Sequence, residues 1–297
     1  MSRFKALCGC AAADILHRAS ELEIIAVHSE SVYMRASDGR MFLLCPQKYG
    51  IVPFGAALYE FDRLRLEKEF FVGERAALKD RDLYFDGGYI LNFDIETKEI
   101  CTHASDTVPS AETLRFCAEY VAEHASARGM GPSLPAFLCI SSPAESANAY
   151  ALTAAAYADR FEESFERSDA QALSDTVSKF IGLGYGLTPS GDDFISGMAY
   201  AFGRFSVCSK KAGRCMRMLR TSVKDKLDRT NEISREYLLC AIGGEYFEVV
   251  ENVLDAISKK KLDRADTEGA MQELLRVGAS SGSDILCGIL FACYILM

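Results

Sequence analysis

The stretch that decides the architecture of this chain reads GLGYGLTPSGDDFISGMAYA and covers residues 182–201. Glycines alternate at its start, a Thr-Pro-Ser-Gly turn follows over residues 188–191, and Asp192 and Asp193 lead into an apolar run. Glycine and proline in this density interrupt regular structure, whereas carboxylates are favoured in the first turn of a helix. The stretch therefore predicts a glycine-rich loop that opens an apolar helix.

A second copy of the pattern lies near the C-terminus, where residues 279–292 read ASSGSDILCGILFA. The positions that are identical at one constant offset are Ser190 and Ser281, Gly191 and Gly282, Asp193 and Asp284, Gly197 and Gly288, and Ala201 and Ala292. This repetition indicates an internal duplication or a convergent pair of loops. We expect the two apolar helices to lie near the centre of a helical domain, with their N-termini converging.

Capture of a small anion is the chemistry that such loops offer. A glycine-rich turn frees backbone N–H groups, the first turn of a helix leaves further N–H groups without intrahelical partners, and serine hydroxyls add donors. The predicted substrate-binding residues are Gly184, Gly186, Thr188, Ser190, Gly191, Thr230, Asn231, Ser281 and Gly282. Thr230 and Asn231 have a second interpretation, because they precede an apolar run and either one is a good helix cap.

The carboxylates of Asp192, Asp193 and Asp284 repel a bare anion and therefore need another role. The predicted catalytic roles are to orient an amide of the ligand, to transfer a proton, or, for Asp192 and Asp193, to hold Mg²⁺. No cofactor is certain. The alternative is that Ser-Gly-x-Asp is only a helix cap, and that Gly197 and Gly288 let two apolar helices pack closely.

The remaining sequence predicts an α+β fold, with a β-rich N-terminal region (1–107) packed on a larger, mainly helical C-terminal domain (108–297). Residues 4–20 are expected to be helical. Strands are expected over Leu22–His28, Ser31–Ala36, Met41–Cys45 and Tyr89–Phe93, with turns at Asp38-Gly39, Asp86-Gly87-Gly88 and Thr97-Lys98. Ser110 is expected to cap a helix that reaches about Ala127, and Pro135–Ile140 to form a short strand or a buried segment.

Composition restricts the partners and the compartment. The net charge of −9 argues against nucleic-acid binding. The eleven cysteines are odd in number and lack a C-x-x-C pair, which predicts buried thiols in a reducing cytoplasm. The longest apolar run, residues 285–297, is too short to span a bilayer, so no membrane contact is expected.

The basic stretch 210–229 is either a solvated face or a docking surface for an acidic partner subunit. Lys48 is either an anion contact or part of a turn.

Three motifs, in this order, resemble those of a bacterial family that includes the AllH subunit of oxamate carbamoyltransferase. They are GLGYGLTPSGDDF from residue 182, TNEIS from residue 230 and GASSGSD from residue 278. The resemblance implies participation in a multi-subunit transferase that cleaves oxalurate with phosphate to oxamate and carbamoyl phosphate, in anaerobic allantoin breakdown. It implies partner transferase subunits and a small anionic substrate such as carbamoyl phosphate, oxamate or an oxalurate-like compound.

One position departs from that family, whose members often carry His where this sequence has Ala279. Two hypotheses about function follow. The chain is a carbamoyltransferase-type protein, or it is a non-catalytic subunit that binds an anionic metabolite or serves assembly alone.

Overall fold

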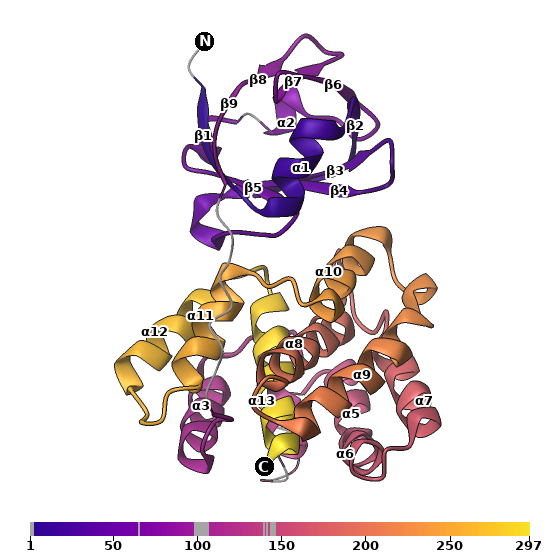
Figure 1. Cartoon of the computed structure of the whole chain (residues 1–297), viewed down its shortest axis with the longest axis vertical. Helices are drawn as coiled ribbons and strands as arrows, with labels where there is room; N and C mark the ends of the chain where they lie inside the picture. The colour runs from indigo at the N-terminus through magenta and orange to yellow at the C-terminus, as the bar shows by residue number, and fades with distance from the viewer. Residues whose placement is uncertain (1–2, 65, 98–106, 139, 141, 143–146) are drawn as a thin grey trace. The chain divides into compact units, whose positions relative to one another are not determined.

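A computed structural model describes residues 3–64, 66–97, 107–138, 140, 142 and 147–297 (Figure 1). The chain forms two compact units. The first contains Met1–Cys101 and Tyr246–Val249, and the second contains Thr102–Glu245 and Val250–Met297. A sheet dominates the first unit and helices dominate the second, which confirms the predicted α+β class. The predicted turn at Thr97-Lys98 extends outside the described residues.

The sheet of the first unit has nine strands among the described residues, in the order β8-β7-β6-β2-β3-β4-β5-β1-β9. Most neighbours are antiparallel, whereas β4 with β5 and β1 with β9 are parallel. The strands are β1 (Phe4–Cys8), β2 (Glu21–His28), β3 (Ser31–Ala36), β4 (Met41–Pro46), β5 (Gly55–Leu58), β6 (Arg75–Lys79), β7 (Asp82–Phe85), β8 (Ile90–Leu91) and β9 (Phe93–Thr97). The predicted strands after residue 20 are confirmed, although the segment Tyr89–Phe93 is divided between β8 and β9.

The helix predicted over residues 4–20 is wrong in its first part, because Phe4–Cys8 forms β1 and only Cys10–Arg18 forms helix α1. β1 lies between β5 and β9, so its backbone groups are paired on both sides. Gly9 makes the change of direction, since a Cβ there would lie 2.3 Å from the carbonyl oxygens of Val52 and Pro53. Tertiary pairing therefore outweighs the local alanine-rich spacing.

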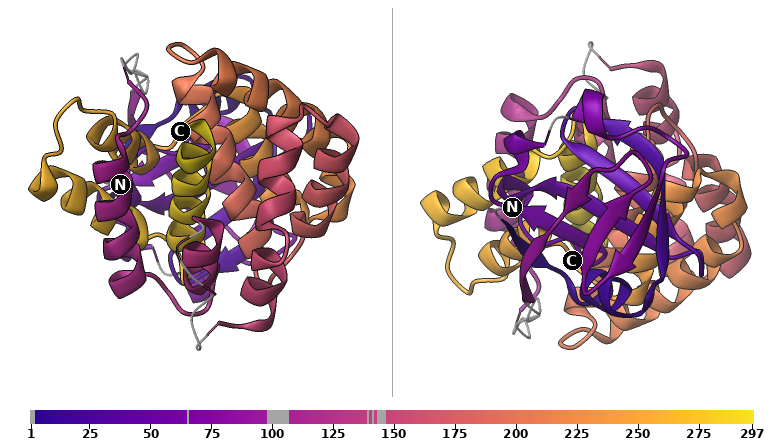
Figure 2. Two further views of the ribbon diagram at one scale, coloured as in Figure 1. Left: turned by 90° about the horizontal axis from the view of Figure 1, so that it is seen from below. Right: turned by 90° about the horizontal axis from the view of Figure 1, so that it is seen from above.

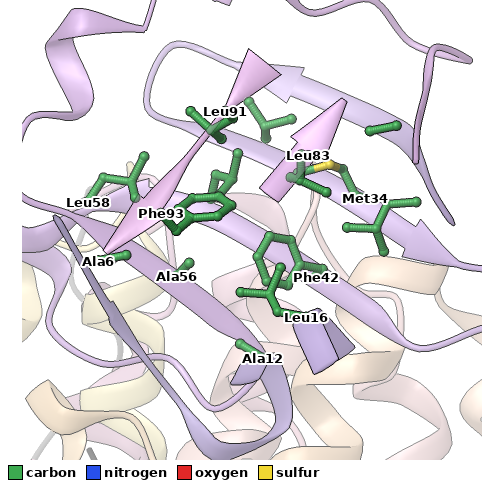
Figure 3. Close-up of a cluster of buried hydrophobic side chains, with 14 of the residues drawn as sticks. Ala6, Ala12, Leu16, Met34, Phe42, Ala56, Leu58, Leu83, Leu91 and Phe93 are labelled. Atoms are coloured by element: carbon green, nitrogen blue, oxygen red, sulfur yellow. The ribbon is translucent and has the colours of Figure 1, made fainter. Parts of the chain in front are cut away.

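The core of the first unit lies between α1 and the curved sheet (Figure 3). Ala12 and Leu16 of α1 point toward Phe42 of β4 (Figure 3). Residues far along the chain complete this unit. Phe247 meets Phe54 edge to face at 6.5 Å, and the backbone N–H of Glu248 donates to the carbonyl of Ile51 at 3.0 Å. Short elements connect the strands, namely η1 (Gln47–Tyr49), η2 (Phe61–Arg63) and α2 (Leu66–Glu69).

Two long apolar helices, α8 (Ser190–Phe205) and α13 (Ser281–Leu296), lie side by side in the second unit (Figures 1 and 2). Around them lie α3 (Ala111–His124), η3 (Gly131–Ser133), α4 (Leu134–Phe137), α5 (Ala149–Ala155), α6 (Ala158–Glu166), α7 (Ala170–Phe180), α9 (Lys210–Lys224), η4 (Leu227–Arg229), α10 (Glu232–Gly243), α11 (Glu248–Ile257) and α12 (Arg264–Leu275). Almost every residue of α8 and α13 is buried, as predicted for helices at the centre of a domain.

Local signals account for several of these helices. Ser110 caps α3 by accepting a hydrogen bond from the N–H of Thr113, as predicted. Residues 135–137 belong to α4, which begins at Leu134, rather than to a strand, and Phe137 stacks on Phe194 of α8 at 4.7 Å. Arg204 at the end of α8 is buried and pairs with Glu251 of α11 at 2.7 Å. Among the described residues no helix is both long and apolar enough to cross a membrane.

Candidate functional site

Helices α8 and α13 touch through one glycine of each sequence copy. A Cβ on Gly197 would lie 2.1 Å from the carbonyl oxygen of Ile285, and a Cβ on Gly288 would lie 2.0 Å from that of Phe194. Phe194 and Ile285 occupy matching positions of the two copies. The contact is therefore reciprocal, as a pseudo-symmetric pair requires, and it supports the interpretation that these glycines allow close packing.

The N-terminal ends of the two helices meet, which confirms the predicted convergence. Thr188, just before α8, and Ser281, at the start of α13, bring their hydroxyl oxygens to 2.8 Å. Both hydroxyls also act on Asp193 as hydrogen-bonding groups that lower its pKa. The hydroxyls of Ser190 and Ser280 have the same effect on Asp284. Each carboxyl thus interacts with hydroxyls of both loops, and the two sequence motifs form one polar cluster.

Asp193 and Asp284 are almost fully buried, at 3% and 0% exposure. Burial is the main cause that raises the pKa of Asp284, to about 7. Burial also raises the pKa of Asp193 well above its usual value, and the neighbouring charge of Asp284 adds to this. In the described part of the chain the Oδ2 atom of each carboxyl has no hydrogen-bond partner. The cluster therefore disfavours two negative charges at once.

Asp192 has a different environment from its neighbour. Its Oδ1 accepts the N–H of Gly182 at 2.8 Å, and its Oδ2 accepts the hydroxyls of Ser234, at 2.6 Å, and Thr230. Burial raises its pKa, although these donors oppose the effect. Asp192 thus ties the glycine-rich loop to the start of α10.

The described residues offer no support for Mg²⁺ at Asp192 and Asp193. Both oxygens of Asp192 already accept hydrogen bonds, and the described ranges contain no group of three or more His, Cys, Asp or Glu side chains placed to hold a metal ion. A Mg²⁺ ion needs oxygen ligands arranged octahedrally around it.

Gly191 and Gly282 allow the start of each helix to pack closely against backbone carbonyl groups of the preceding segment. Their N–H groups donate to the carbonyls of Leu183, at 2.8 Å, and Val277, at 3.0 Å. A Cβ on Gly191 would lie 2.1 Å from the Phe180 oxygen, and one on Gly282 would lie 1.8 Å from the Leu274 oxygen. The predicted role of these two N–H groups in binding an anion is therefore not supported, because both donors are already used inside the loops.

Other predicted binding residues lie nearer the surface. Gly186 and Asn231 are exposed, whereas Gly184, Thr188, Thr230 and Ser281 are half-buried. Gly184 and Gly186 have φ values of 122° and 96°, which favour glycine, and Tyr185 between them is 87% exposed. Asn231 caps α10 by accepting the N–H of Ser234, and its amide donates to the Leu187 carbonyl at 2.9 Å. These predicted residues are therefore more exposed than the three carboxyls.

A loop that the sequence reasoning missed closes the cluster on one side. The N–H of Met130 donates to Asp284, and the N–H of Ser126 donates to the Ser283 hydroxyl at 2.9 Å. A Cβ on Gly129 would lie 2.1 Å from Asp284 Oδ1, so a side chain at this position would require Asp284 to move. Asn148, the cap of α5, holds this loop by donating to the Gly129 carbonyl at 2.9 Å. The only signal in the sequence is the Gly-x-Gly spacing at 129–131.

Lys48 and the basic residues of α9, the two weaker candidates for a binding role, have the surroundings of surface residues. Lys48 forms an ion pair with Glu30, which also accepts the hydroxyl of Tyr49. The basic residues of α9 lie mainly on its exposed or half-buried side, as the solvated-face interpretation expects.

Residues 180–293 match the model of a family described as oxamate carbamoyltransferase subunit AllH. The match begins just before the first glycine-rich loop and ends within α13, so it contains both copies of the motif. It confirms the resemblance inferred from the motifs. No curated protein and no solved structure gives a significant match.

Proposed function

We propose that this chain is a carbamoyltransferase-type subunit that acts on a small ureido carboxylate and carbamoyl phosphate together with partner subunits. The observation that carries the proposal is that the segment matching the oxamate carbamoyltransferase subunit family is the segment that holds the paired loops. In the proposed reaction, phosphate attacks the carbamoyl carbon of an oxalurate-like substrate. The C–N bond to the oxamate nitrogen breaks, a C–O bond to phosphate forms, and the leaving nitrogen takes up a proton.

The more exposed residues of the cluster supply the anion contacts in this proposal. The donors are the hydroxyls of Thr188 and Ser281, whose oxygens lie 2.8 Å apart, together with backbone N–H groups of Gly184 and Gly186 from the same loop as Thr188. Asp193 and Asp284 are buried and interact with hydroxyls of both loops, and Asp192 fixes the loop. We therefore propose positioning roles for the three aspartates, in place of direct contact with substrate. Partner subunits supply any further catalytic groups.

Non-catalytic binding of an anionic metabolite is the second candidate function. Ala279 stands where the resembling family often carries His, and the three aspartates are buried. A subunit of this kind holds the anion while partner subunits perform the chemistry.

Ligand binding by the purified chain tests both candidates. A thermal-shift titration with carbamoyl phosphate, oxamate, oxalurate and phosphate is expected to raise Tm with increasing concentration for at least one of them. The Thr188→Val variant keeps the shape of the side chain, removes the hydroxyl and is expected to abolish the shift. The matched control is Thr221→Val on α9, whose hydroxyl bonds only to its own helix at the Arg217 carbonyl.

Turnover separates the two candidates. Formation of carbamoyl phosphate from oxalurate and phosphate is measured with and without the partner subunits. A loss of turnover in the assembled complex carrying Thr188→Val, with substrate affinity reduced in parallel, is expected under either candidate. Turnover by the isolated chain supports the catalytic one. No Tm shift with any ligand, and unchanged turnover in the variant complex, would contradict both.

A further inference from the structure

The crossing of α8 and α13 buries two carboxyl groups without a basic partner. Asp193 and Asp284 come from matching positions of the two copies and lie close enough to influence each other's charge. Neither forms an ion pair within the described residues, and the Oδ2 atom of each is buried and unpartnered. A buried polar atom with no partner needs a physical explanation, and here there are two of them in one cluster.

Protonation relieves the two buried charges better than a bound cation does. Two neighbouring carboxylates in a buried site cannot both stay ionised, so the pair retains a proton. A hydrated cation needs space, whereas Asp284 is packed so closely that a single added carbon at Gly129 would overlap its Oδ1 at 2.1 Å. A proton needs no space, and it removes one of the two buried negative charges.

We propose that Asp193 and Asp284 form a carboxyl pair that keeps a proton and thereby turns one of the Thr188 and Ser281 hydroxyls outward as a donor to an anion. The proposal rests on the proposed function, because it assigns the control of that same anion site. It makes Asp193 and Asp284 positioning residues that act through the two hydroxyls.

The direction of the hydroxyl hydrogens carries the effect. An ionised Asp193 accepts only, so it draws the hydrogens of Thr188 and Ser281 inward, as the contacts to its carboxylate describe. A protonated Asp193 donates to one of these hydroxyls. That hydroxyl then donates its own hydrogen to the other hydroxyl, whose oxygen lies 2.8 Å away. The hydrogen of the second hydroxyl is no longer drawn toward Asp193 and is free to donate to an anion. No covalent bond other than O–H is involved, and the proton stays on the pair.

Few other charges act on this pair from the surrounding helices. Asp192 on α8 and the Cys287 thiol on α13 are the titratable neighbours that interact with it electrostatically. The loop at residues 126–130 contributes backbone N–H groups, and the α10 hydroxyl of Ser234 is occupied by Asp192. Burial raises the pKa of Asp284 to about 7 and the pKa of Asp193 well above its usual value, so the pair releases its last proton at neutral pH or above.

Calorimetric titration with oxamate tests the proposal, because the oxamate carboxylate stays ionised over the whole range from pH 5.5 to 9. Buffers with different ionisation enthalpies report the protons taken up on binding. We expect the affinity to fall about tenfold per pH unit above the apparent pKa of the pair, with uptake that approaches one proton in that range. Asp193→Asn is expected to bind oxamate with little pH dependence. Asp284→Asn removes a neighbouring charge and is expected to shift the profile to lower pH.

Glu251→Gln provides the matched control, because Glu251 is also buried and its pKa is also raised to about 7, but it pairs with Arg204. This variant should keep the pH profile of the unchanged chain. An affinity that is constant from pH 5.5 to 9 without proton uptake in the unchanged chain overturns the proposal, whether or not the variants fold. Binding that requires a divalent cation and disappears with EDTA also overturns it. No oxamate binding at any pH by the folded complex counts against the proposed function instead.

Discussion

At the scale of single residues, glycine and aspartate define the cluster in complementary ways. The side chain of Asp284 occupies space that Gly129, which lacks a side chain, leaves open. Asp192 and Asp193 are adjacent in the sequence, yet one joins Gly182 to α10 and the other faces α13. Two neighbouring carboxylates thus have different roles because successive helical residues point about 100° apart.

Gly129→Ala is expected to destabilise the protein by about 1–3 kcal/mol, because the new methyl group overlaps Asp284 Oδ1. The free energy of unfolding in urea measures the change. Gly269→Ala is the control, since a Cβ there meets nothing within 4 Å in the middle of α12. That substitution is expected to stabilise by about 0.5–1 kcal/mol. Equal stabilities of the Gly129→Ala variant and the unchanged chain would show that the loop does not pack on Asp284.

The pH dependence of stability is expected to change in Asp284→Asn. The folded pKa of Asp284 is raised to about 7, so the folded state keeps a proton that the unfolded chain releases from about pH 4 upward. The contribution of this residue to stability is therefore fully present at acid pH and is lost as the pH rises through about 7. Relative to the variant, the unchanged chain should lose up to about 1.4 kcal/mol per pH unit in this window. Urea unfolding from pH 4.5 to 8 measures the difference, and parallel curves for the two proteins would contradict it.

At the scale of elements, two helices of similar sequence make one interface. α8 and α13 approach each other at Gly197 and Gly288. A backbone carbonyl of each helix therefore lies where a side chain of the other helix would otherwise be. Large apolar side chains then surround the crossing, and Phe194 stacks on Phe137 of α4 and on Phe291 of α13. The close approach brings the N-terminal loops together and so determines where the hydroxyls and carboxyls meet.

Gly197→Ala and Gly288→Ala are each expected to cost about 1–3 kcal/mol, because a backbone carbonyl about 2 Å away cannot move without separating the helices. The double variant should lose less stability than the sum of the losses in the two single variants, because the helix separation forced by one methyl group makes room for the other. Gly213→Ala on α9 is the control, with its nearest atom at 3.7 Å. Strictly additive losses in urea unfolding would indicate that the two glycines do not share one contact.

At the scale of the whole molecule, the division into compact units does not follow the order of residues along the chain. Tyr246–Val249 belongs to the same unit as the N-terminal sheet, although the residues on either side belong to the helical unit. In that unit Phe247 is buried, and Ile51 exchanges hydrogen bonds with Glu248. The first unit is therefore built from two separate parts of the sequence.

Phe247→Ala is expected to destabilise the first unit by about 3–5 kcal/mol, because it removes a buried ring that packs against Phe54. Hydrogen exchange of the β4 and β5 amides should become faster, whereas exchange in α8 should change less. Phe71→Ala is the matched control, since Phe71 is 58% exposed. Unchanged exchange in β4 and β5 would show that Tyr246–Val249 does not support the sheet.

The sequence by itself determined what local chemistry controls: the α+β class, the hairpin strands, the Ser110 cap, the two glycine-rich loops and the helices that follow them. Periodicity, turn residues and repetition carry this information within a few residues of each other. Only the tertiary structure decided that Phe4–Cys8 is a strand, because its partners β5 and β9 lie far along the chain. It likewise showed that Gly191 and Gly282 use their N–H groups internally, and that Gly129 closes the cluster. Burial and close backbone approach arise from contacts between distant segments, and no local pattern records them.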